Sequence, residues 1–136
     1  MGERAAPSQL DATLLRAHPL PQPGEDVDKN SRGRVLCAGG SRKVAGGLLL
    51  TAEAAFRAGA GKVQMVGPSG LTLPLAMAMP EAAVFALEED EEGEISGGTD
   101  VLCRQALLSD AVVVGPAMID EGGAGLLVDA LLAEPS

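Results

Sequence analysis

Short apolar runs that end in glycine-rich turns alternate along this chain with stretches that favour helix. The apolar runs cover residues 34–38, 62–66, 83–87 and 111–114, and the helix-favouring stretches cover residues 46–58, 71–78, 98–108 and 124–133. Such alternation is typical of βα units joined by right-handed crossovers, with the strands buried between two layers of helices. The sequence therefore predicts an α/β fold of three layers, with a mainly parallel sheet and helices on both faces.

Three of the four expected strands run into loops of small residues. These loops are Gly39-Gly40-Ser41 after the first strand, Gly67-Pro68-Ser69-Gly70 after the second and Gly115-Pro116-Ala117 after the fourth. Ligands of open α/β sheets bind outside the carboxyl ends of the strands, where the chain turns toward the next helix. We expect a binding crevice at these loops, made mainly of backbone.

Size and composition limit the classes of function open to the chain. It has 136 residues, enough for one ordinary domain, and a formal net charge of −9. That charge opposes binding to nucleic acid or anionic membranes, and the chain lacks the Trp and Tyr rings on which single-stranded nucleic acid stacks. We expect no nucleic-acid partner, and no membrane segment because the longest uncharged stretch, residues 63–80, contains three prolines.

The reactive side chains are few and scattered. Cys37 and Cys103 stand far apart in apolar or helical stretches, which indicates buried thiols without a disulfide, a reducing compartment and hence a cytoplasmic location. The single histidine, His18, lies in the N-terminal segment, so no Ser-His-Asp or Cys-His set can be assembled. We predict no catalytic residue and no metal site, and we interpret Asp120 and Glu121 as caps of the last helix.

Two further segments lie outside the alternating pattern. Residues 1–31 are predicted to form an N-terminal arm, with a short helix over residues 8–17 capped by Ser8, that lies across the domain. Residues 88–94 hold six acidic residues among seven, which is most often a solvated loop or hairpin tip. A cation site would require spaced ligands, so we expect a solvated tip.

The loop of residues 39–47 is the strongest candidate for ligand contact. It joins the first strand to the first long helix, where backbone N–H groups and the helix dipole can face an anionic ligand. It lacks the Lys-Ser/Thr ending of a P-loop and the GxGxxG spacing of a dinucleotide fingerprint. Taken alone, its glycines fit two interpretations equally well: contact with a phosphorylated ligand, or tight turning and close helix packing.

Two longer stretches carry a resemblance to a known family. KNSRGRVLCAGGS over residues 29–41 and GGLLLTAEAAFRAGAGKV over residues 46–63 resemble, in order and spacing, the opening of the ADP/ATP-dependent NAD(P)H-hydrate dehydratases. Pro80-Glu81 and the AVVVGP run of residues 111–116 resemble the next two landmarks of that family. The likeness extends from about Pro19 to the C-terminus.

This resemblance implies a ribokinase-like fold and a repair reaction. ADP or ATP with Mg²⁺ would phosphorylate the hydroxyl of hydrated NADH or NADPH, and loss of phosphate would restore the reduced cofactor. The residues implied to bind the substrate are Gly39, Gly40, Ser41, Gly46, Gly47, Gly115, Pro116 and Ala117. The chain departs from the family at two places, with Gly47 where alanine is usual and Ala117-Met118-Ile119 where Gly-Leu-Gly is usual.

The later landmarks of the family have no counterpart in these residues. They are a histidine-bearing loop and a Gly-x-Gly-Asp segment that supplies the catalytic aspartate and the nucleotide contacts. We therefore predict that residues 32–136 form the N-terminal half of a ribokinase-like domain, C-terminally incomplete, which presents part of the pocket without turnover of its own. An unfinished sheet leaves an apolar edge, so we expect self-association or a completing chain.

Two alternatives to this hypothesis remain open at the level of sequence. One is a truncated, non-catalytic module that binds a nucleotide or pairs with another subunit. The other is a ribokinase-like small-molecule kinase, which shares the fold but usually lacks the Gly-Gly-Ser opening. Incubation with hydrated NADH, ADP or ATP and Mg²⁺, followed as the return of reduced-nicotinamide absorbance, tests the leading hypothesis, which turnover by the chain alone would contradict.

Overall fold

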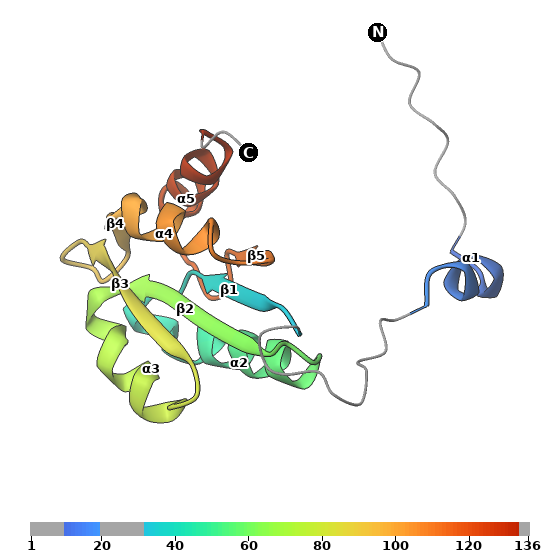
Figure 1. The fold of residues 1–136 in the computed structure, drawn as a ribbon. Helices are drawn as coiled ribbons and strands as arrows, with labels where there is room; N and C mark the ends of the chain where they lie inside the picture. The colour runs from blue at the N-terminus through green and yellow to red at the C-terminus, as the bar shows by residue number, and fades with distance from the viewer. Residues whose placement is uncertain (1–9, 20–31, 134–136) are drawn as a thin grey trace, which may run out of the picture.

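Five strands form one sheet in the order β4-β3-β2-β1-β5. The computed structural model describes residues 10–19 and 32–133, whose fold Figure 1 shows. The strands are β1 (Arg34–Ala38), β2 (Lys62–Pro68), β3 (Ala83–Glu89), β4 (Ile95–Gly97) and β5 (Ala111–Val114). Four of them run parallel, and β4 is antiparallel to β3. The predicted α/β class with a mainly parallel sheet is confirmed.

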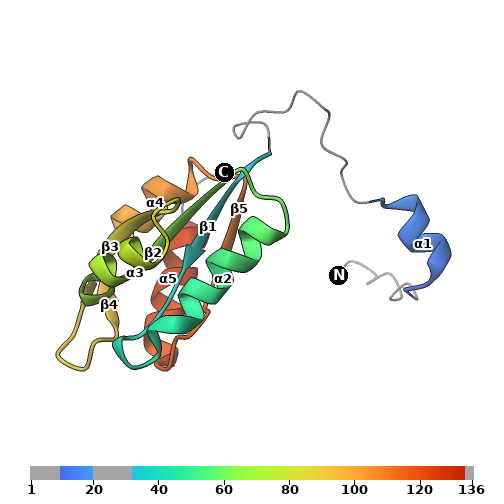
Figure 2. The same cartoon turned by 90° about the horizontal axis from the view of Figure 1, so that it is seen from below.

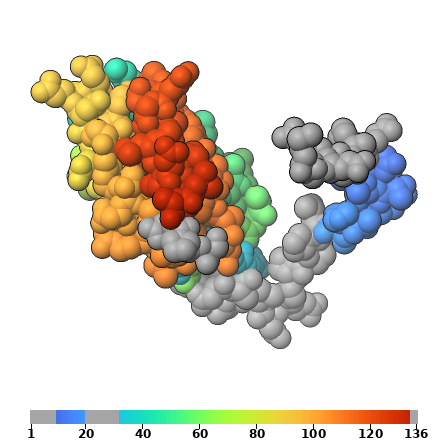
Figure 3. Space-filling model, turned by 90° about the horizontal axis from the view of Figure 1, so that it is seen from above, coloured from blue at the N-terminus to red at the C-terminus, as the bar shows by residue number. Residues whose placement is uncertain are grey.

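Two pairs of helices cover the two faces of this sheet. α2 (Ala45–Arg57) and α3 (Thr72–Ala78) lie on one face, while α4 (Thr99–Ala106) and α5 (Glu121–Ala133) lie on the other (Figure 1). Figure 3 looks onto the second face, where α5 lies beside α4. Two short 3₁₀ helices, η1 (Arg42–Val44) and η2 (Ser69–Leu71), precede α2 and α3. The predicted three layers are therefore present.

Strand β1 lies between β2 and β5 and is covered on both faces of the sheet. Its successive side chains point in opposite directions and enter two different cores. Leu36 packs in one core with Leu102 of α4 and Leu127 of α5. Cys37 packs in the other core with Leu48 of α2. All five side chains are fully buried. Burial raises the pKa of the Cys37 thiol to about 11, so this thiol stays protonated and unreactive at neutral pH.

The N-terminal helix is shorter than the sequence predicts. α1 (Ala12–Ala17) begins after Asp11, whose Oδ1 accepts the N–H groups of Thr13 and Leu14 at 2.9 Å each. The cap is therefore Asp11, and the prediction of a helix from Ser8 is wrong for residues 10 and 11. Residues 1–9, which include Ser8, and residues 20–31 of the predicted arm lie outside the described residues. No residue of α1 is buried.

The acidic run forms the tip of an antiparallel hairpin made by β3 and β4. We call residues 83–97 the acidic hairpin. The predicted hairpin tip is confirmed, but its predicted solvation is wrong for Glu94, which is only 8% exposed. β4 was not predicted, because three residues are too few to display the alternation that marks a strand.

Across the described ranges, no helix is long and apolar enough to cross a membrane. The longest helices, α2 and α5, have 13 residues each. A helix that spans a bilayer needs about 20 apolar residues.

Candidate functional site

Three strand-end loops meet at one end of the sheet, the end that also carries the acidic hairpin (Figure 2). The Gly39 N–H donates to the Val66 carbonyl at 3.0 Å, which joins the loop after β1 to the end of β2. The Gly40 N–H donates to the Pro116 carbonyl at 2.8 Å, which joins the same loop to the one after β5. The expectation that these loops lie together is therefore confirmed.

Bare backbone is required where these loops touch. Gly39 has a φ of +153°, and a Cβ there would lie 2.6 Å from the carbonyl oxygen of Pro116. A Cβ on Gly67 would lie 2.7 Å from the carbonyl oxygen of Gly39. Any side chain at these positions would force the loops apart, because real Cβ atoms do not approach so closely. At Gly39 the packing interpretation of the glycines is therefore the stronger one.

The predicted site residues divide into a buried group and an accessible group. Gly39, Gly40 and Ser41 are buried, so they support the loop from within. The others reach the surface, and they are Gly46, Gly47, Gly115, Pro116 and Ala117. A Cβ at Gly46 or Gly115 would meet no atom within 4 Å, so the backbone at both positions faces open space.

The start of α2 contributes to this accessible group. Gly46 and Gly47 lie in its first turn, and no side chain caps the helix at Val44. The first N–H groups of a helix and the positive end of its dipole attract anionic and polar ligands. The exposed backbone of α2 and of the loop after β5 can thus bind a polar ligand between them.

Gly47 and Ala117 share one small space between these two segments. A Cβ on Gly47 would lie 2.4 Å from the Cβ of Ala117. Ala117 has a φ of +56°, the one positive φ of a non-glycine residue in the described part of the chain. The two departures from the family pattern are therefore reciprocal, because the methyl group missing at Gly47 is replaced by the methyl group of Ala117.

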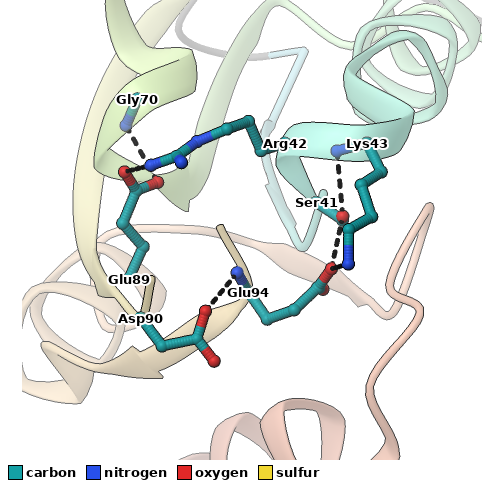
Figure 4. Close-up of polar contacts among 7 residues, drawn as sticks. All are labelled: Ser41, Arg42, Lys43, Gly70, Glu89, Asp90 and Glu94. Atoms are coloured by element: carbon teal, nitrogen blue, oxygen red, sulfur yellow. Dashed lines mark hydrogen bonds and ion pairs between the residues drawn. The ribbon is translucent and has the colours of Figure 1, made fainter. Parts of the chain in front are cut away.

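The buried side chain of Ser41 is bonded on both sides. Its Oγ donates to Oε1 of Glu94 at 2.7 Å and accepts the N–H of Lys43 at 3.1 Å (Figure 4). The hydroxyl group is thereby used within the protein, so the side chain of Ser41 does not face a ligand. The sequence reasoning missed this role, since Glu94 lies 53 residues further along the chain.

Glu89 joins two of the strand-end loops from the side of the acidic hairpin. Its Oε2 accepts the N–H of Gly70 at 3.1 Å, and its Oε1 accepts from the guanidinium of Arg42 (Figure 4). The Gly70 N–H, followed by the Arg42 guanidinium, holds the pKa of Glu89 below its ordinary value of 4.5. Glu89 therefore stays ionised at neutral pH and keeps both contacts.

A cavity of about 550 Å³ lies beside the hairpin, between η2, β3, β4 and the start of α4. Its lining includes three carboxylates, Glu88, Glu89 and Asp100. Such a lining repels phosphate groups, so this cavity does not suit a nucleotide. Among the residues that the structure describes, no group of three or more His, Cys, Asp or Glu side chains could hold a metal ion. We therefore do not assign this cavity to the nucleotide.

Comparison with known proteins assigns the chain to a family. The family model Carb_kinase, described as NAD(P)H-hydrate dehydratase, matches residues 35–134. The chain belongs to this family. It is 46% identical over 119 residues to the ADP-dependent (S)-NAD(P)H-hydrate dehydratase of Xanthomonas campestris, a match that covers 88% of this chain and 40% of that protein.

Solved structures agree with this assignment of the fold. A ribokinase-like superfamily protein from Enterococcus faecalis matches with a TM-score of 0.69 at 27% identity, over 85% of this chain and 37% of that one. The ADP/ATP-dependent NAD(P)H-hydrate dehydratase from Bacillus subtilis, co-crystallised with ATP/Mg²⁺, matches with a TM-score of 0.61 at 21% identity. The match covers 83% of this chain and 38% of that one. The fold is ribokinase-like, and the chain spans about 40% of the length of its relatives.

Proposed function

We propose that this chain takes part in the repair of hydrated NADH or NADPH and supplies part of the substrate pocket. The observation that carries the proposal is the junction of two accessible segments, the start of α2 and the loop after β5. There Gly47 and Ala117 are in contact, and the backbone at the nearby residues Gly46 and Gly115 faces open space. The names of the relatives supply the substrate, since they are NAD(P)H-hydrate dehydratases.

The pocket would act by binding and orienting the hydrated nicotinamide through backbone groups. The N-terminus of α2 suits the phosphorylated part of such a ligand. ADP or ATP with Mg²⁺ is proposed as the phosphoryl donor from the names of relatives, one ADP-dependent and one crystallised with ATP/Mg²⁺. None of the described residues is assigned a contact with this donor. The buried Cys37 thiol suits a reducing compartment, which supports a cytoplasmic location.

The test is to incubate the chain with hydrated NADPH, ADP or ATP, and Mg²⁺. Binding is measured by equilibrium dialysis, and turnover is followed as the return of reduced-nicotinamide absorbance. We expect binding of hydrated NADPH in preference to intact NADPH, without turnover. Equal binding of hydrated and intact NADPH would contradict the proposed pocket. Turnover by the chain alone would contradict the proposal that it supplies only part of the substrate pocket.

The β5 edge of the sheet is the proposed surface for self-association or a completing chain. β5 ends the strand order, and its Val112 and Val113 side chains are 37% and 41% exposed. Unpaired apolar edge strands accept further strands, and a lysine on such a strand opposes this pairing. We expect a concentration-dependent rise in sedimentation coefficient that Val113→Lys suppresses and Leu50→Lys, at an exposed position on α2, leaves unchanged. A monomer at every concentration would contradict self-association through this edge and would leave a completing chain as its partner.

A further inference from the structure

We propose that the acidic hairpin positions the substrate-binding loop, and that Glu94 is its positioning residue. This inference rests on the proposed function, because it concerns the same loop of residues 39–47. The acidic hairpin is absent from the predicted site, yet its contacts reach two of the three strand-end loops (Figure 4).

The carboxylate of Glu94 acts on the loop through Ser41. Glu94 accepts the hydrogen bond of the Ser41 hydroxyl at 2.7 Å, and both residues are buried. Ser41 in turn caps η1 by accepting the Lys43 N–H, and η1 continues directly into α2 at Ala45. A shift of Ser41 would therefore move the first turn of α2, which holds Gly46 and Gly47.

Hydrogen bonds within the tip of the hairpin, and from the tip to η1, fix the backbone of Glu94 in place. The Glu94 N–H donates to Oδ1 of Asp90 at 2.9 Å, and the Asp90 N–H donates to the Glu94 carbonyl at 3.0 Å. The Gly93 carbonyl accepts the N–H of Arg42 at 3.0 Å, which bonds the tip to the backbone of η1. A Cβ on Gly93 would lie 2.4 Å from the Cβ of Arg42, so the two backbones are in close contact.

The hairpin also forms ion pairs with both cations of the loop. Arg42 pairs with Glu89, and the Lys43 Nζ lies 3.9 Å from a carboxylate oxygen of both Glu92 and Glu94. Loss of the Glu94 carboxylate would release Ser41 and would leave Lys43 with Glu92 alone, and the start of α2 would lose the contact that fixes its position.

The experiment compares Glu94→Ala with Glu94→Gln and with Glu92→Ala. Gln keeps an oxygen that can accept from Ser41, while Ala leaves the buried hydroxyl without its acceptor. The Glu92 side chain is 73% exposed and belongs to the same hairpin, so its removal is the matched control. We expect Glu94→Ala to weaken binding of hydrated NADPH about tenfold, which is about 1.4 kcal/mol. Glu94→Gln and Glu92→Ala should stay within about twofold of the unaltered chain.

Hydrogen exchange of the ligand-free chain tests the same inference without any ligand. Glu94→Ala is expected to speed amide exchange of residues 42–47 about tenfold, while residues 34–38 of β1 keep their protection. Ser41→Ala added to Glu94→Ala should bring little further change at residues 44–47 and should speed mainly the Lys43 amide, whose acceptor it removes. Unchanged exchange at residues 42–47 in Glu94→Ala overturns the inference. Failure of the unaltered chain to bind hydrated NADPH overturns the proposed function instead, and the exchange result then still decides the role of the hairpin.

Discussion

Replacement of Gly47 by alanine is expected to lower the free energy of unfolding by about 1–3 kcal/mol, the usual cost of overpacking. The added Cβ would lie 2.4 Å from the Cβ of Ala117, and neither atom can turn away because each is fixed to backbone. The loop after β5 would have to shift from the start of α2. Urea denaturation followed by far-ultraviolet circular dichroism measures the change.

Gly46 offers a matched control in the preceding position of the same helix. A Cβ there would meet no atom within 4 Å. Gly46→Ala is therefore expected to stabilise the chain by up to about 1 kcal/mol, since alanine favours helix over glycine. If Gly47→Ala lowers the free energy of unfolding while Gly46→Ala raises it, the loss comes from the contact with Ala117 and not from the helix itself. Changes of the same sign in both variants would contradict the expected clash between the Cβ added at Gly47 and Ala117.

The reciprocal exchange predicts the result of the double substitution. In Gly47→Ala with Ala117→Gly, one methyl group again occupies the shared space, now carried by α2. Glycine also suits the positive φ of residue 117, which an alanine adopts at a cost. We expect the double variant to regain most of the stability lost in Gly47→Ala, with a coupling energy of about 0.5–3 kcal/mol. A double variant as unstable as Gly47→Ala alone would show that the two positions do not share this space.

Apart from β4, the strands and helices of the fold were predictable because each is marked by a local pattern. The run of residues 111–114 and the glycine that follows it identify β5, and similar signals identify β1, β2 and β3. The limits of α1 were not predictable from Ser8, because Asp11 offers an equally good capping side chain. Asp120, by contrast, caps as predicted, since its Oδ2 accepts the Gly123 N–H at 2.7 Å.

The site was predictable only as far as topology determines it. Parallel strands bring their carboxyl ends to one edge, so the meeting of the loops at Gly39 and Gly115 followed from the strand pattern. The contacts of Glu89 and Glu94 did not follow, because an acidic run looks alike whether solvated or paired. The signal that could have indicated the pairing is Arg42-Lys43, the basic pair in the loop that the acidic hairpin contacts.

Replacement of Leu127 by alanine is expected to cost about 2–5 kcal/mol of stability, the range for large-to-small changes in a packed core. Leu127 is fully buried and joins α5 to the core that contains Leu36 and Leu102. Its removal would leave a cavity between α4, α5 and the sheet. The measurement is urea denaturation. The midpoints of the variant and the unaltered chain are compared, and the dependence of the unfolding free energy on urea concentration should be the same in both.

Leu132 of the same helix supplies the control, because its side chain is 79% exposed. Leu132→Ala should change the stability by no more than about 0.5 kcal/mol. The sequence pattern groups both leucines on one apolar side of the helix, so it cannot distinguish the buried residue from the exposed one. A small effect of Leu127→Ala would mean that α5 does not pack on the sheet, and the second helical layer would then be incomplete. A large effect of Leu132→Ala would mean instead that another surface covers this end of α5 in solution, next to the exposed β5 edge.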